Sequence, residues 1–180
     1  EWNFLDMGIQ QLGAIHIPIY PTISDADYAY ILAHAEVSYV FVAGEEMYKR
    51  IRHIVPDIPC IKAIYTFKDI TGMQHLNELI QLGKENARPE ELRILKDKVS
   101  PSDLVTIIYT SGTTGTPKGV MLSHENILSN VMAVKHIPPF GPEHRAMSFL
   151  PICHIYERMM NYTLIYKGLS MYYLANMAVI

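Results

Sequence analysis

The stretch from Tyr109 to Gly119 constrains this chain most, because small hydroxyl residues and glycines follow one another there and end at a single lysine. Glycine lacks a Cβ atom, so Gly112, Gly115 and Gly119 can take positive φ angles and let backbone N–H groups converge on one point. Serine and threonine hydroxyls and the Lys118 ammonium add further donors. Such a loop suits a phosphate group, although clusters of this composition between strands are usually plain solvated turns.

The residues on either side of this stretch indicate how it is held. Residues 104–109 are apolar and β-branched and predict a strand, residues 120–122 predict a second one, and Ser123 predicts the N-cap of a helix to about Lys135. A Walker loop has the pattern GxxxxGK[ST] and leads directly into a helix, whereas Lys118 follows Pro117 and precedes a strand. We therefore expect a hairpin connection whose own N–H groups and hydroxyls would hold the anion.

The first hundred residues predict helices and strands in alternation. An apolar stripe predicts a helix over 2–13, residues 14–20 predict a short strand, and the pattern Ser24-x-x-Asp27 predicts a capped helix over 25–34. A strand over 37–43, a helix over 45–55 and a strand over 61–67 form a βαβ unit, for which a parallel sheet is expected. Residues 74–98 predict two surface helices that are separated near Arg88 and Pro89.

The last part of the chain repeats this order. Residues 145–150 predict a strand, residues 159–166 an apolar helix ended by Gly168, and residues 169–174 a last strand. The expected fold class is α/β, with βαβ units and a largely parallel sheet flanked by helices. We expect residues 1–100 to form a first βαβ portion with surface helices, and residues 101–180 to form the portion that carries the phosphate loop.

Composition excludes several classes of protein. The chain is 49% hydrophobic and 18% charged, which is typical of a globular protein, and its longest apolar runs are far shorter than the roughly 20 residues of a spanning helix. A formal net charge of −3 offers no broad basic face for nucleic acid. The basic cluster over 49–53 is expected to be the solvated face of a helix. Cys60 and Cys153 are expected to be buried, reduced thiols, and no histidine spacing predicts zinc.

Three segments, in order along the chain, resemble the adenylate-forming (AMP-binding) enzymes, specifically the branch of long-chain fatty-acid–CoA ligases or acyl-CoA synthetases. The stretch Tyr-Thr-Ser-Gly-Thr-Thr-Gly-Thr-Pro-Lys-Gly over 109–119 resembles the phosphate-binding signature of that family. The stretch Ser-Phe-Leu-Pro-Ile-Cys-His-Ile-Tyr-Glu-Arg over 148–158 is similar to a segment of the long-chain ligases. Residues 13–22 are similar to the strand and turn that precede the first βαβ unit of the family.

The resemblance implies a two-step reaction and the residues that would serve it. ATP and a carboxylate give an acyl-adenylate and pyrophosphate, and the thiol of coenzyme A then displaces AMP to form a thioester. Magnesium would bridge phosphate oxygens, with Thr110 as a weak protein ligand. Carried over by position, the residues that would bind the ATP phosphates are Thr110, Ser111, Gly112, Thr113, Thr114, Gly115 and Lys118.

The segment around His154 has a structural and a functional interpretation. The resemblance places His154 and Tyr156 near the acyl and adenylate sites, whereas from the residues alone His154 could be a hydrogen-bonded histidine at a helix start and Tyr156 a core residue. Glu157 and Arg158 are expected to be an adjacent surface pair. The Met and Tyr residues over 159–166 are more often core than the wall of a substrate tunnel.

Later signatures of the family do not occur in this sequence, including its magnesium-binding glutamate and its C-terminal lysine. We therefore expect a piece of the large N-terminal domain, without the C-terminal lid domain, with no catalytic residue of its own and no activity alone. The expected location is the cytoplasm, with peripheral contact at the inner membrane as an alternative. Two other functions remain open: an aryl-acid or amino-acid adenylating enzyme, and a non-catalytic module that binds a phosphate or nucleotide.

Overall fold

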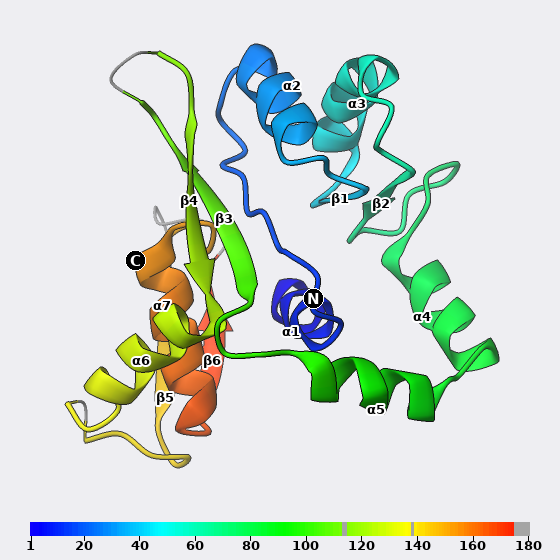
Figure 1. The fold of residues 1–180 in the computed structure, drawn as a ribbon. Coiled ribbons are helices and arrows are strands. Elements are labelled where there is room, and N and C mark those ends of the chain that lie inside the picture. Colours follow the sequence, from blue (N-terminus) through cyan, green and yellow to red (C-terminus); the bar gives the residue numbers. More distant parts are fainter. Residues whose placement is uncertain (113–114, 138, 175–180) are drawn as a thin grey trace.

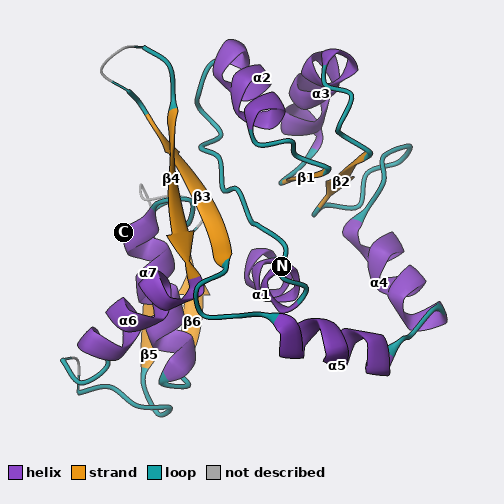
Figure 2. Ribbon diagram, in the orientation of Figure 1, coloured by secondary structure: helices purple, strands orange, loops and turns teal. Residues whose placement is uncertain are grey.

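The computed structural model describes residues 1–112, 115–137 and 139–174, which form a mixed α/β fold (Figure 1). The strands form three separate pairs, and Figure 2 shows helices beside them. The helices are α1 (Trp2–Gln11), α2 (Asp25–His34), α3 (Glu45–Ile54), α4 (Leu76–Glu85), α5 (Pro89–Lys98), α6 (His124–Val134) and α7 (Ile155–Tyr166), with a short 3₁₀ helix η1 (Val55–Asp57) after α3. The strands are β1 (Tyr39–Val42), β2 (Ala63–Thr66), β3 (Leu104–Thr110), β4 (Lys118–Ser123), β5 (Arg145–Ser148) and β6 (Ser170–Tyr173).

The expected βαβ unit is confirmed in β1, α3 and β2. The two strands pair in parallel, from Tyr39 opposite Ala63 to Val42 opposite Thr66, and α3 connects them. The predicted cap of α2 also forms, since the Ser24 side chain accepts a hydrogen bond from the Asp27 N–H at 3.1 Å. The apolar faces of α2, α3 and the strands meet in a core made of Tyr28, Leu32, Val42, Ile51, Ile54, Ile58 and Ile64.

A second parallel pair, β5 and β6, is connected by α7 and confirms the expected order of the C-terminal part. The helix begins earlier than predicted, at Ile155 instead of Met159. The reason is a local cap, because the Nδ1 atom of His154 accepts a hydrogen bond from the Tyr156 N–H at 3.3 Å. The apolar segment and the polar segment before it therefore belong to one helix.

Between these pairs lies the antiparallel hairpin of β3 and β4. The strand predicted over 14–20 is wrong: only His16 forms a bridge, to Thr106 of β3, through its N–H and the Val105 carbonyl at 3.1 Å. Pro18 has no N–H to donate, so the pairing cannot continue along this segment.

Helices α4 and α5 form the most exposed part of the described chain. Neither has a buried residue, and Figure 1 shows them as an arm that leads from β2 back to β3. This confirms the prediction of two surface helices. No helix among the described residues has the length and hydrophobicity needed to cross a membrane.

A buried polar cluster joins α1, β3 and α7, and we call it the Arg158 cluster. Arg158 is fully buried, and its guanidinium donates hydrogen bonds to Asp6 Oδ1 at 2.6 Å, Thr106 Oγ1 at 2.6 Å and Tyr162 Oη at 2.8 Å. Asp6 and Thr106 are also fully buried. The Asp6 carboxylate is further bonded to His16 Nδ1 at 2.6 Å, so the ion pair is surrounded by compensating hydrogen bonds.

The expectation of a surface pair at Glu157 and Arg158 is therefore wrong. Adjacent helical residues point in different directions, and here both directions lead into the protein. The Glu157 side chain is 7% exposed and accepts hydrogen bonds from Ser148 of β5 and Asn161 of α7. The two charged side chains therefore bond to different neighbours: Glu157 to Ser148 and Asn161, and Arg158 to the residues of the Arg158 cluster.

Replacing one partner of the buried ion pair is expected to destabilise the fold strongly. Arg158→Met leaves the Asp6 carboxylate buried without its cation, which should lower the free energy of unfolding by about 3–5 kcal/mol. The double variant Asp6→Leu/Arg158→Met, which removes both charges, should lower it by less than the single change. The surface variant Arg93→Met, which breaks exposed pairs to Glu90 and Asp97, is the control and costs under about 1 kcal/mol. Urea unfolding measures these differences, and equal losses for Arg158→Met and Arg93→Met would contradict the assignment.

The same cluster predicts a loss of stability in acid. Burial by itself raises the pKa of Asp6. The hydrogen bond from His16 and the positive charge of Arg158 lower it by more than burial raises it, so the pKa lies below its ordinary value of 3.8. The folded chain thus binds this proton more weakly than the unfolded chain, so the contribution is complete above about pH 5 and is lost as the pH falls through the lowered pKa. Unfolding free energies from pH 7 to pH 3 should decline less steeply for Asp6→Asn than for the wild type.

Candidate functional site

The hydroxyl- and glycine-rich stretch lies at the tip of the β3–β4 hairpin, as the sequence predicted. The last pair of the ladder joins Thr110 to Lys118, and the Ser123 cap of α6 closes the far end of β4. The chain thus turns at the tip without a helix behind it (Figure 1). Any anion at this tip would be held by the hairpin itself, not by a helix N-terminus.

The glycines of the stretch serve two different needs. Gly115 has a φ of +87°, which a residue with a side chain rarely adopts. Gly112 and Gly119 are needed for space instead: a Cβ atom at Gly112 would lie 2.4 Å from the Thr116 carbonyl oxygen, and one at Gly119 would lie 2.7 Å from an Ile107 methyl carbon. The expectation that all three take positive φ is therefore confirmed for Gly115 alone.

The hairpin tip carries polar groups that are open to solvent. Thr110, Ser111, Thr116 and Lys118 are exposed. In the part of the chain that the structure describes, no side chain of the protein accepts a hydrogen bond from their hydroxyls or forms an ion pair with the Lys118 ammonium. Thr113 and Thr114 lie outside the described residues. The tip thus presents donors of the kind that a phosphate group requires.

The second predicted site, at His154 and Tyr156, lies at the start of α7. His154 is exposed and caps the helix through Nδ1, which agrees with its structural interpretation. Tyr156 is 54% exposed, so its interpretation as a core residue is wrong. The buried positions of α7 are instead Glu157, Arg158, Asn161, Thr163 and Leu164.

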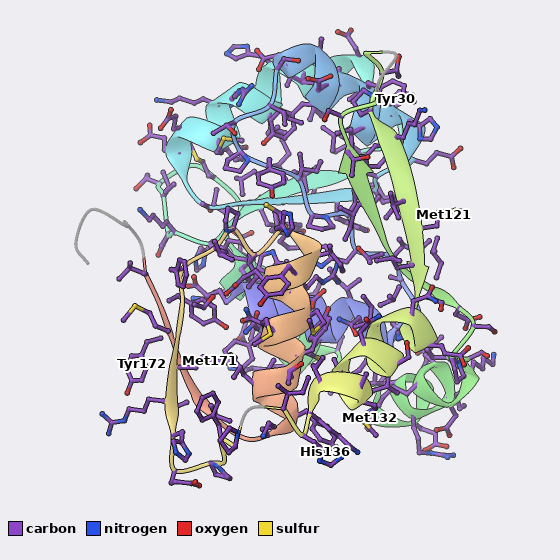
Figure 3. The ribbon with its side chains drawn as sticks, turned by 90° about the vertical axis from the view of Figure 1, so that its left-hand side faces the viewer. Tyr30, Met121, Met132, His136, Met171 and Tyr172 are labelled. Atoms are coloured by element: carbon purple, nitrogen blue, oxygen red, sulfur yellow. The ribbon has the colours of Figure 1, made fainter. Side chains whose placement is uncertain are left out.

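Tyr156 contributes to a groove between α6 and α7, which lie side by side (Figure 3). The groove has a volume of about 460 Å³. Three polar residues of α6 lie along one wall, and the apolar lining consists of Leu122, Ile127, Ile155, Tyr156 and Met159. An open groove with this lining can accept a hydrophobic chain whose polar end stays near solvent.

No group of three or more histidine, cysteine, aspartate or glutamate residues within the described ranges could hold a metal ion. Cys60 and Cys153 are free thiols, and only Cys153 is buried, so the expectation of two buried thiols holds for one of them. The Thr110 hydroxyl is the one predicted metal ligand. It could supply a single oxygen atom to an ion whose other ligands come from a bound phosphate and water.

Sequence reasoning missed Asp6, His16, Thr106 and Tyr162 of the Arg158 cluster. One signal was available, because Asp6 follows Trp2 by four residues and so shares the apolar face of α1. An acidic residue on such a face predicts a buried partner. Nothing in the local pattern indicated that the partner would come from the end of the chain.

Comparisons with known proteins place the chain in a family. Residues 1–179 match the family model described as AMP-binding enzyme. The chain is 33% identical to fatty acyl-CoA synthetase A of Dictyostelium discoideum, over 93% of this chain and 26% of that protein. It is 29% identical to the peroxisomal long chain acyl-CoA synthetase 6 of Arabidopsis thaliana, over 94% of this chain and 25% of that protein. The chain thus spans about a quarter of the length of these relatives.

Solved structures show the same fold at low sequence identity. A natural red emitting luciferase from Phrixothrix hirtus matches with a TM-score of 0.80 and 16% identity, over 96% of this chain and 34% of that one. ATP-bound MatB from Rhodopseudomonas palustris matches with a TM-score of 0.67 and 21% identity, over 94% of this chain and 32% of that one. Since the family model covers almost every residue and contains the hairpin, the chain belongs to the AMP-binding enzyme family.

Proposed function

We propose that this chain is part of an ATP-dependent long-chain fatty-acid–CoA ligase, which activates a carboxylate as an acyl-adenylate and transfers the acyl group to coenzyme A. The observation that carries the proposal is the hairpin tip, where exposed hydroxyls and the Lys118 ammonium stand without partners in the described chain. The acyl-CoA synthetases among its relatives support the acid–thiol ligase class. Because those relatives are about four times longer, the activity is proposed for the full-length protein that contains these residues.

In this proposal the hairpin tip binds the phosphates of ATP. Lys118 neutralises charge, and the hydroxyls of Thr110 and Ser111 and the backbone N–H group of Gly112 donate hydrogen bonds. Gly115 shapes the turn, since its own N–H donates to the Gly112 carbonyl at 3.1 Å. Thr113 and Thr114 are proposed to join the phosphate-binding residues. Attack of the carboxylate on the α-phosphorus breaks the bond to pyrophosphate and increases negative charge on the leaving oxygens. Donors that are already in place stabilise that charge without reorganisation. MatB, whose structure holds ATP, supports the nucleotide.

Magnesium is proposed to bind with the ATP phosphates. The Thr110 hydroxyl lies at the last rung of the hairpin, beside Lys118, and suits a hard cation that prefers oxygen ligands. When bound, the ion would neutralise phosphate charge. The side chains of this hairpin would then only orient the phosphates and position one oxygen toward the ion.

The acyl substrate is proposed to lie at the start of α7. The groove beside Tyr156 has the apolar lining that a fatty-acid chain needs. His154, two residues earlier, is exposed to solvent, where the polar carboxylate end of the substrate would lie. A long acyl chain gains free energy with each methylene group that leaves water, about 0.8 kcal/mol. Coenzyme A would be the second substrate, and a cytoplasmic location stays a prediction, since one relative is named as peroxisomal.

Removing the lysine of the hairpin is expected to impair the use of ATP. In the full-length protein, Lys118→Ala should reduce kcat/KM for ATP on the order of 10²-fold, as is typical when one preorganised donor is lost. Lys84→Ala, which removes an exposed lysine from α4, is the matched control and should leave the rate unchanged. Pyrophosphate release measures both, and equal rates for the two variants would refute the phosphate assignment.

Shortening the aromatic wall of the groove is expected to affect the acyl substrate. Tyr156→Ala should raise KM for a long-chain fatty acid at least about tenfold, because a large apolar side chain contributes roughly 1.5–3 kcal/mol when a ligand covers it and each 1.4 kcal/mol is about tenfold. KM for ATP should stay unchanged. Tyr172→Ala removes a similarly exposed tyrosine from β6 and serves as the control. A Tyr156→Ala enzyme with wild-type KM for every chain length would exclude this groove as the acyl site.

A further inference from the structure

We propose that His34 of α2 is a positioning residue for the phosphate hairpin, acting through Tyr109, the β3 residue that precedes Thr110. The inference rests on the proposed function and adds a residue outside the hairpin. Tyr109 Oη and His34 Nδ1 lie 2.7 Å apart and share a hydrogen bond. Their rings meet edge to face, with centroids 5.9 Å apart and an interplanar angle of 89°.

A third ring completes this α2–β3 contact, which consists of Tyr30, His34 and Tyr109. Tyr30 lies one helical turn before His34, and the two rings are stacked with centroids 5.2 Å apart and an angle of 27°. Figure 3 labels Tyr30 beside the upper part of the hairpin. The imidazole is therefore held from two sides, which fixes the direction of its hydrogen bond to Tyr109.

Tyr109 transmits this restraint to both strands of the hairpin. It pairs with Gly119 across the ladder, and a Cβ atom at Gly119 would lie 3.3 Å from a carbon of the Tyr109 ring. The tyrosine ring thus packs over the glycine that follows Lys118. Burial, and then the nearby Tyr30, raise the pKa of Tyr109 above its ordinary value, so its hydroxyl stays protonated at neutral pH.

Helix α2 is a firm support for this contact. Its residues Tyr28 and Leu32 are at most 4% exposed and belong to the core that α2 shares with α3, β1 and β2. A two-stranded hairpin alone, in contrast, is only marginally stable in water. Without a fixed base, the tip can tilt relative to the rest of the site. Small displacements of binding groups cost affinity and rate because the groups no longer converge on the phosphates.

A purely structural role for His34 predicts different results from a positioning role. If the contact only adds stability, its loss lowers the free energy of unfolding and leaves the affinity of folded protein for ATP unchanged. If the contact positions the hairpin, ATP affinity falls while the KM for the fatty acid stays constant. A residue that keeps a hydrogen-bonding group near the place of Nδ1 should then restore ATP affinity.

The experiment uses the full-length protein and measures ATP binding with Mg²⁺ by calorimetry in the absence of fatty acid. The variants are His34→Ala, His34→Asn, Tyr109→Phe and the double variant His34→Ala/Tyr109→Phe. His53→Ala, which removes an exposed histidine from α3, is the matched control. Urea unfolding and the KM for fatty acid are measured on the same samples.

We expect His34→Ala and Tyr109→Phe each to raise the Kd for ATP about 3- to 10-fold, the range for one lost hydrogen bond. The double variant should be no weaker than the single ones, because both remove the same bond, and His34→Asn should lie within about twofold of wild type. Wild-type Kd in folded His34→Ala, full additivity in the double variant, or no rescue by asparagine would overturn the positioning role. Wild-type protein that binds no ATP would instead overturn the proposed function, and the positioning role with it.

Discussion

The ion pair between Arg158 and Asp6 is the interaction on which the other parts of this structure depend. Two charged groups without solvent are costly unless their remaining hydrogen-bonding capacity is met, and here Thr106, Tyr162 and His16 meet it. Those partners belong to β3, α7 and the segment after α1, and Asp6 itself lies on α1. One guanidinium thus fixes the first helix, the strand that leads to the phosphate loop and the helix that begins at the proposed acyl site.

The two proposed halves of the site are connected through this cluster. Thr106 and Thr110 lie on the same strand, and Arg158 lies one helical turn after His154 on α7. The hairpin tip and the start of α7 are therefore held relative to each other by buried charge, while the α2–β3 contact restrains the hairpin from the other side. The exposed hydroxyls and the Lys118 ammonium, which have no partner among the described residues, are thus positioned by buried groups whose hydrogen bonds are complete.

Most helices and strands of this structure could be predicted from local sequence patterns. Apolar spacing and capping residues such as Ser24 predicted most helices, and the proline before Lys118 predicted a hairpin instead of a Walker loop. The prediction failed where distant residues decide the outcome. Pro18 ended a strand that composition favoured, Arg158 and Glu157 proved buried because their partners are far away in the sequence, and the contact between His34 and Tyr109 joins two elements that no local pattern connects.

The distance along the chain between Asp6 and Arg158 has a consequence for how the protein reaches its folded state. The two residues are separated by 152 positions, so their contact closes a very long loop. During synthesis, α1 emerges long before α7, and Asp6 must remain hydrated until its partner arrives, because a charge buried alone would be too costly. The buried position of Asp6 therefore requires Arg158 of α7 to be in place, and such non-local closure favours slow folding.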